Sequence, residues 1–160
     1  MRARAVGRTR GVTLIEMMVV MLIIAVIVSV STPSITAGID AVRLATATST
    51  VASFLNSAVN LAERRQRPVE LIVSLKDNRI EFLSTDAGSG RKLTLPEGIF
   101  LEAVEPQTPE DPDAGRSLLI MPGGAVPGIG IQLANHHGGR RLVHLDPMTG
   151  FPRVENVENK

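Results

Sequence analysis

Cysteine, tryptophan and tyrosine are absent from this chain of 160 residues, and phenylalanine occurs only four times. Without cysteine the chain has no disulfide, no thiolate nucleophile and no cysteine-ligated metal, so its folded part must be held together by its core alone. Sites for sugars and for single-stranded nucleic acid usually stack the ligand on aromatic rings, which are scarce here. The sequence also lacks a G-x-S-x-G or S-x-x-K motif, a phosphate-binding loop and a complete dinucleotide fingerprint. We therefore expect neither an enzyme nor a bound cofactor.

The charges are almost balanced but unevenly placed. Seventeen basic and sixteen acidic residues give a formal net charge of +1, and four of the basic residues fall in the first eleven positions, which contain no acidic residue. The remaining side chains, thirteen basic and sixteen acidic, are mildly acidic as a set. A broad surface for nucleic acid or for an anionic membrane is therefore not indicated.

Residues 12–30 form one long apolar run, in which only Thr13, Glu16 and Ser29 are polar. A helix of this length extends about 28 Å, close to the ~30 Å thickness of the hydrocarbon part of a bilayer. The run can therefore cross a membrane. Because arginines at positions 2, 4, 8 and 10 precede it, we expect the N-terminus to stay in the cytoplasm and the rest of the chain to face outward.

Glu16 is the one charged residue inside this run. A carboxylate in an apolar span costs up to about 2.5–3.5 kcal/mol at mid-bilayer, and less near the end where this one lies, so it needs a partner. The run offers no positive side chain. If the chain is cut after Gly11, Val12 gains a charged amine four residues before Glu16. That amine, or the amine of a neighbouring copy, can pair with the carboxylate when helices stack side by side.

A short basic leader, Gly11, and then Thr13-Leu14-Ile15-Glu16 opening an apolar helix resemble the signal of type IV prepilins and of type II secretion pseudopilins. The resemblance implies that a membrane prepilin peptidase cleaves between Gly11 and Val12 and methylates the new N-terminus at Val12. It also implies that Glu16 guides assembly into a helical filament. The family usually has phenylalanine where this chain has Val12, which bears on the efficiency of cleavage.

Two other interpretations of the N-terminus remain open. An ordinary secretory signal peptide would share the basic start and the apolar core, and Ser29-Val30-Ser31 would serve as its cleavage site. Glu16 within the core, and a core longer than the usual ~7–15 residues, argue against it. A plain membrane anchor is the second alternative.

We divide the chain into a cleaved leader (1–11), a membrane-spanning half-helix (12–30), an amphipathic periplasmic half-helix (31–67) and an antiparallel β domain (69–160). Pro33 is expected to bend the helix without ending it, whereas Pro68 ends it. Apolar residues at three- and four-residue steps predict one buried stripe on the second half of the helix. The stripe comprises Ile35, Ile39, Val42, Ala45, Ala52, Leu55, Ala58, Val59 and Ala62.

Beyond Pro68 the pattern changes to short strands separated by turns. The expected strands are 69–75, 79–84, 91–95, 99–105, 117–121, 128–134, 140–146 and 151–157. In strand 99–105 we expect Ile99, Leu101 and Ala103 on one side and Val104 on the other, and we expect 117–121 to be buried. The fold class is therefore α+β, a long N-terminal helix packed on antiparallel sheets or a sandwich.

The C-terminal segments 118–125, 128–133 and 141–154 resemble the shared domain of H-type minor pseudopilins and of the related T-type minor pilins. The resemblance implies a subunit anchored in the inner membrane, with its sheet domain in the periplasm, that joins the filament of a type II secretion system. Its partners would be other pseudopilins, through the N-terminal helix, and the prepilin peptidase. The alternative is a minor pilin of a type IV pilus, including a DNA-binding subunit for DNA uptake.

Three further groups are candidate sites. Arg140 and Arg141 form the one candidate nucleic-acid contact, although acidic residues of the C-terminal tail weaken it, so nucleic-acid binding is not expected. His136 and His137 are adjacent and have no third ligand nearby in sequence, so we expect a hairpin tip and no metal site. The acidic loop at 106–115 lacks the full ligand spacing of a calcium motif, and we expect a solvated loop, with calcium as the alternative.

Overall fold

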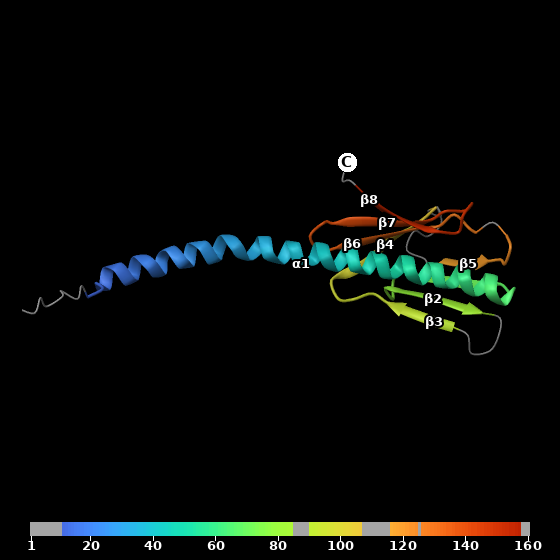
Figure 1. Cartoon of the computed structure of the whole chain (residues 1–160), viewed down its shortest axis with the longest axis horizontal. Coiled ribbons are helices and arrows are strands. Elements are labelled where there is room, and N and C mark those ends of the chain that lie inside the picture. Colours follow the sequence, from blue (N-terminus) through green and yellow to red (C-terminus); the bar gives the residue numbers. More distant parts are fainter. Residues whose placement is uncertain (1–10, 85–89, 107–115, 125, 158–160) are drawn as a thin grey trace, which may run out of the picture. The chain divides into compact units, whose positions relative to one another are not determined.

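The structure is a computed structural model that describes residues 11–84, 90–106, 116–124 and 126–157, except for the side chains of 32–35 and 37. Within these residues it contains one helix followed by eight strands (Figure 1). The chain divides into two compact units, Met1–Gly38 and Ile39–Lys160. The first unit contains the N-terminal part of the helix, and the second contains the rest of the helix and all the strands. The predicted α+β class is confirmed.

Helix α1 (Leu14–Arg65) is 52 residues long and continues through Pro33. Continuation at this proline agrees with the sequence analysis, and the bend there stays a prediction. At the other end, Gln66 has a φ of 51° and the Arg67 N–H donates to the Ala62 carbonyl at 3.3 Å. This left-handed residue with a bond back to the last turn is a common way to end a helix.

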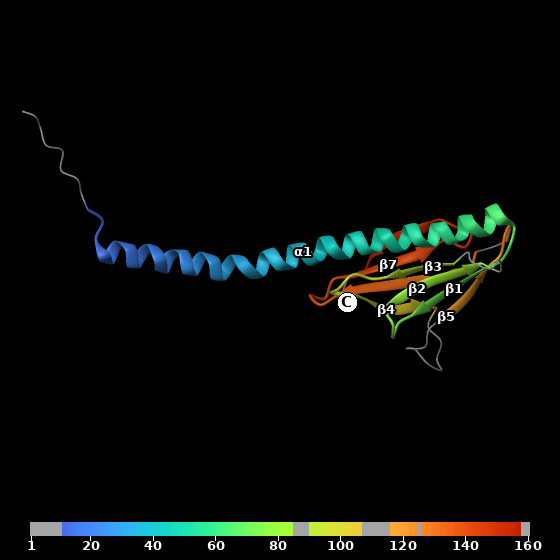
Figure 2. The same cartoon turned by 90° about the horizontal axis from the view of Figure 1, so that it is seen from below.

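The strands form two four-stranded antiparallel sheets. Sheet A has the order β3-β2-β1-β5, and sheet B has the order β4-β6-β7-β8. Figure 2 shows strands of the second unit lying along its part of α1. The strands are β1 (Val69–Ser74), β2 (Arg79–Ser84), β3 (Gly90–Thr94), β4 (Ile99–Glu105), β5 (Arg116–Ile120), β6 (Gly130–Asn135), β7 (Arg140–Leu145) and β8 (Pro152–Asn156).

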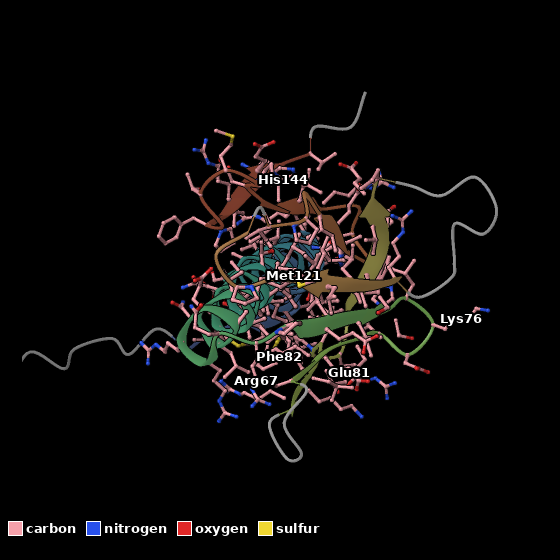
Figure 3. All side chains as sticks on the ribbon, turned by 90° about the vertical axis from the view of Figure 1, so that its right-hand side faces the viewer. Arg67, Lys76, Glu81, Phe82, Met121 and His144 are labelled. Carbon is pink, nitrogen blue, oxygen red and sulfur yellow. The ribbon has the colours of Figure 1, made fainter. Side chains whose placement is uncertain are left out.

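The core of the second unit lies between α1 and the two sheets. Phe54 of α1 and Phe82 of β2 pack against each other with ring centroids 4.8 Å apart. Figure 3, which views the domain from the end of α1, labels Phe82 below the helix and Glu81 farther out on the same strand. The helix buries Leu44, Ala47, Thr48, Val51, Phe54, Leu55, Ala58 and Ala62.

The predicted buried stripe on α1 is therefore only partly right. Leu55, Ala58 and Ala62 are buried as expected, but Ile39 is 48 % exposed and Val42 is 66 % exposed. Three- and four-residue steps fit two neighbouring stripes of one helix equally well. The sheets cover the stripe that passes through Leu44, Ala47 and Val51, which leaves Ile39 and Val42 on an uncovered side.

Two expectations for the strands are wrong. The register of β4 against β6 shifts between Leu101 and Ala103, so that Val104 is buried together with Ile99 and Leu101. Such a bulge adds one residue and reverses the alternation beyond it. Strand β5 is not buried as a whole, because it forms an edge of sheet A, and its Leu119 is 51 % exposed.

A single side chain joins the turn between β1 and β2 to sheet B. The amide of Asn78 donates to the Ile99 carbonyl at 2.7 Å, and its oxygen accepts the Leu101 N–H at 2.9 Å. Asn78 has a φ of 49°, a left-handed conformation that asparagine tolerates better than most residues. The turn of sheet A is thereby bonded to strand β4 of sheet B.

Candidate functional site

The first candidate site is the start of α1. Gly11, Val12 and Thr13 precede the helix, and Glu16 lies in its first turn. The Thr13 hydroxyl oxygen accepts the Glu16 backbone N–H at 3.3 Å, and the Thr13 carbonyl accepts the Met17 N–H at 3.2 Å. Thr13 is therefore the N-cap, and Thr13-Leu14-Ile15-Glu16 has the sequence of a capping box.

This capping role of Thr13 was absent from the sequence interpretation, which treated Thr13 as a polar residue in the run and as part of the processing motif. The signal that could have found it is the T-x-x-E spacing itself, because a threonine followed three residues later by glutamate marks helix N-termini. Glu16 also lies where a negative charge is favourable, near the positive end of the helix dipole. The motif thus has a local structural cause besides any role in processing.

The apolar half of α1 is fully uncovered within the described structure. The segment Leu14–Ser31 has a mean hydropathy of 2.7, and none of it is buried. Its length and composition allow it to cross a membrane. No ion pair of Glu16 occurs within the described part of the chain, so the carboxylate and the apolar surface around it both lack an intramolecular partner there. The leader, residues 1–10, lies outside the described residues.

Arg140 and Arg141 do not form one surface. The Arg140 guanidinium donates to Glu102 at 2.8 Å and 2.9 Å, and Glu102 also accepts from Gln132 at 2.8 Å. The hydrogen bonds that Arg140 donates to Glu102 hold the pKa of Glu102 below its usual value, and the same bonds raise the pKa of Arg140. Arg141 follows on the same strand and points to the opposite side. Of the two arginines of the candidate nucleic-acid contact, Arg140 is therefore neutralised by Glu102, and Arg141 lies on the other side of the strand.

His136 and His137 lie in the turn between β6 and β7, as predicted for a hairpin tip. The His136 ring lies against Phe100, with centroids 5.6 Å apart. The Nδ1 atom of His137 is 2.9 Å from one carboxylate oxygen of Asp40, and the other oxygen of that carboxylate is 3.4 Å from Arg43. In the described parts of the chain, no three His, Asp or Glu side chains converge as a metal site would require. The acidic loop proposed as a calcium alternative lies outside the described residues from 107 to 115.

The N-terminal motif and the fold are each similar to those of type IV pilin-like proteins. Residues 7–32 match the family model of the prokaryotic N-terminal methylation motif. The structure is similar to that of a minor pseudopilin, EpsH from the Type 2 Secretion System of Vibrio cholerae. The TM-score is 0.55 at 16 % sequence identity, and the match covers 71 % of this chain and 97 % of that chain. No curated protein matches the sequence.

A methylation motif at the head of an apolar helix agrees with the predicted pilin-like N-terminus, and the two-sheet domain agrees with the predicted pseudopilin fold. The fold class inferred from sequence is thus confirmed, and both matches agree with the resemblance from which the family was inferred.

Proposed function

We propose that this protein is an H-type minor pseudopilin that joins the periplasmic filament of a type II secretion system. The observation that carries the proposal is the uncovered apolar half of α1. It lies within the segment 7–32 that matches a methylation motif, carries one carboxylate, and continues into the core helix of a two-sheet domain. An uncovered apolar helix would be unfavourable in water, whereas a subunit that is held in a membrane and then packs against other helices keeps this surface out of water.

Processing would create the second charge of this site. In the precursor the peptide nitrogen of Val12 is neutral. Cleavage between Gly11 and Val12 gives Val12 a positively charged amine, and methylation keeps that charge. The arginine-rich leader keeps the cleavage site on the cytoplasmic side, and the sheet domain then lies in the periplasm. The inner membrane holds the mature subunit until it is assembled.

Assembly would follow from the cost of the lone carboxylate. Glu16 in lipid is costly, and the cost falls when it meets an amine from its own or a neighbouring N-terminus. Helices that stack side by side cover their apolar surfaces and pair these charges at the same time. The sheet domain contributes contacts with other minor subunits or with secreted cargo. The work of the protein is therefore assembly and not catalysis.

The experiment that tests this proposal is mass spectrometry of the native protein after cross-linking in its own membranes. We expect an N-terminal peptide that starts at a methylated Val12 and cross-links to secretion pseudopilins. A methylated Val12 cross-linked to pilus subunits would keep the mechanism and assign the protein to a type IV pilus. An N-terminus near Thr32 without such partners would mean that the protein is a secreted soluble domain, and the proposal would be wrong.

A substitution at Glu16 tests the role of the carboxylate. Glu16→Ala keeps the backbone N–H that Thr13 caps but removes the charge, so we expect normal cleavage and weaker incorporation into filaments. Glu16→Asp keeps the charge and is the matched control, which should assemble nearly as well as the native protein. Cleavage is measured by mass spectrometry, and incorporation by the amount of subunit in sheared filaments. Equal incorporation of Glu16→Ala and the native protein would contradict this account.

A further inference from the structure

An open groove runs between α1 and the edge strand of sheet A. It has a volume of about 280 Å³, and its wall includes Val42, Thr46 and Thr50 of the helix and Leu93, Leu95 and Pro96 of the facing segment. Because β3 is an edge strand, no further strand of the sheet closes this side of the domain. We call this cavity the threonine groove.

The threonine groove is apolar in spite of its two hydroxyls. The Thr46 hydroxyl donates to the Val42 carbonyl at 3.0 Å, and the Thr50 hydroxyl donates to the Thr46 carbonyl at 2.9 Å. These bonds run back along the helix, so the hydroxyl donors are already satisfied. Small residues at this spacing let another helix approach closely. Val42, which the stripe analysis expected to be buried, lies at one end of the groove with two thirds of its surface exposed.

A polar cavity adjoins the threonine groove and shares Arg43 and Pro96 with it. This basal cavity has a volume of about 480 Å³ and is also lined by Asp40, Glu97 and His136. Asp40 lies one helical turn before Arg43, and their side chains are 3.4 Å apart. The Arg43 side chain remains 59 % exposed, and the Asp40 carboxylate also contacts His137.

The two cavities follow α1 in a fixed order. Proceeding toward the C-terminus, the helix presents a negative charge at Asp40, a positive charge at Arg43 and then the apolar threonine groove. A processed pilin-like N-terminus has the complementary order in the same direction. It presents a positive amine at Val12, a negative carboxylate at Glu16 and then an uncovered apolar helix.

We propose that the basal cavity and the threonine groove bind the N-terminal half-helix of a neighbouring pilin-like subunit, lying parallel to α1. Its N-terminal amine and its carboxylate, which pair with each other in the processed helix, face Asp40 and Arg43 respectively, and its apolar side chains fill the threonine groove. The inference rests on the proposed function and deepens it by naming the surface of this subunit that receives the next helix. Aligning Glu16 with Arg43 offsets the two helices by 27 residues, which is about 40 Å along the axis.

This arrangement also explains why an unprocessed subunit would bind the site less strongly. Before cleavage the residue at Val12 has no charged amine, and Arg8 and Arg10 precede it closely. In the parallel alignment these arginines lie beyond the Asp40 end of the basal cavity, and the precursor has no charged amine to face Asp40. The site would therefore bind processed helices more strongly than precursors, because only a processed helix brings a positive charge to Asp40.

The test uses the full-length chain in its own membranes, with a photo-crosslinking residue at Thr46, at Ile23 or at Ala41. Thr46 lines the groove, Ile23 lies in the apolar half of α1, and Ala41 is an exposed control on α1 that lines neither cavity. We expect Thr46 to capture a peptide that begins with the methylated N-terminus of a pilin-like subunit, and Ala41 to capture none. Equal capture at Thr46 and Ala41 would overturn the inference.

The position Ile23 separates failure of the inference from failure of the proposed function. If Ile23 captures pilin-like subunits while Thr46 captures a secreted protein, or nothing, the inference is overturned and the proposed function stands. If Ile23 also captures no pilin-like subunit, both are wrong.

The charge pairing has its own test. Arg43→Gln should lower capture at Thr46 by about tenfold, the effect of losing one charge-assisted hydrogen bond. Arg43→Lys, which keeps the charge, should retain most of the capture. Equal capture by Arg43→Gln and the native chain would overturn the charge pairing.

Discussion

Phe82→Ala should strongly destabilise the sheet domain, because this ring is the main aromatic contact between α1 and sheet A. Phe82 is almost fully buried and packs on Phe54 at 4.8 Å. A buried Phe→Ala change costs about 3–5 kcal/mol, a large part of the about 5–15 kcal/mol that stabilises a typical domain. The domain has no disulfide to limit the loss. Phe82→Leu keeps most of the apolar volume and should cost only about 1 kcal/mol.

The assay is urea unfolding of residues 39–160, the unit that contains the whole buried core. A double-mutant cycle with Phe54→Leu and Phe82→Leu measures the contact between the rings, which should contribute about 0.5–1.5 kcal/mol beyond the buried area. The slope of the free energy of unfolding against urea should stay constant among the variants. A loss below about 1.5 kcal/mol for Phe82→Ala, or additive single changes in the cycle, would refute the reasoning.

Three further measurements test other parts of the domain. Gly150→Ala should destabilise the domain more than Gly123→Ala. Both glycines have a positive φ, but of the two only Gly150 would bring its added Cβ against side chains, at 3.3 Å and 3.4 Å. Equal losses of stability in a thermal melt would exclude a packing role for Gly150. The lowered pKa of Glu102 adds stability above its unfolded pKa that is lost as the pH falls through the folded value. Glu102→Gln should therefore flatten the acid limb of the stability curve, and an unchanged limb would argue against the ion pair with Arg140. In a gel-shift assay at low salt we expect no DNA binding by the soluble domain, and a salt-dependent shift lost in Arg140→Ala/Arg141→Ala would reverse that view.

Local patterns predicted the elements well. Strand bounds at 79–84 and 99–105 agree with β2 and β4, because turn residues and alternation are written within a few positions. The methylation motif could also be recognised from the sequence, because the basic leader, Gly11, Glu16 and the apolar run occur together in one short segment. No comparable local pattern indicates which segments lie on either side of each element.

The errors share a physical cause. The bulge that turns Val104 inward depends on the register against β6, and the exposure of Leu119 depends on β5 being an edge strand. Both are properties of pairing between distant segments. The ion pair of Arg140 with Glu102 joins residues 38 positions apart, so the two arginines looked like a basic cluster only along the sequence. Asp40 and Arg43, by contrast, are one turn apart on a helix and could have been recognised as a pair.

The bond network of Asn78 has a consequence for how this fold can vary. Its one amide satisfies a donor and an acceptor on β4, so sheets A and B are fastened at a point that uses no apolar packing. Loops and outward-facing side chains of sheet A can then diversify without altering how the two sheets are joined. Among related proteins, freedom to change would be concentrated on the outer surface of sheet A, while position 78 would be restricted to asparagine by both its conformation and its two partners.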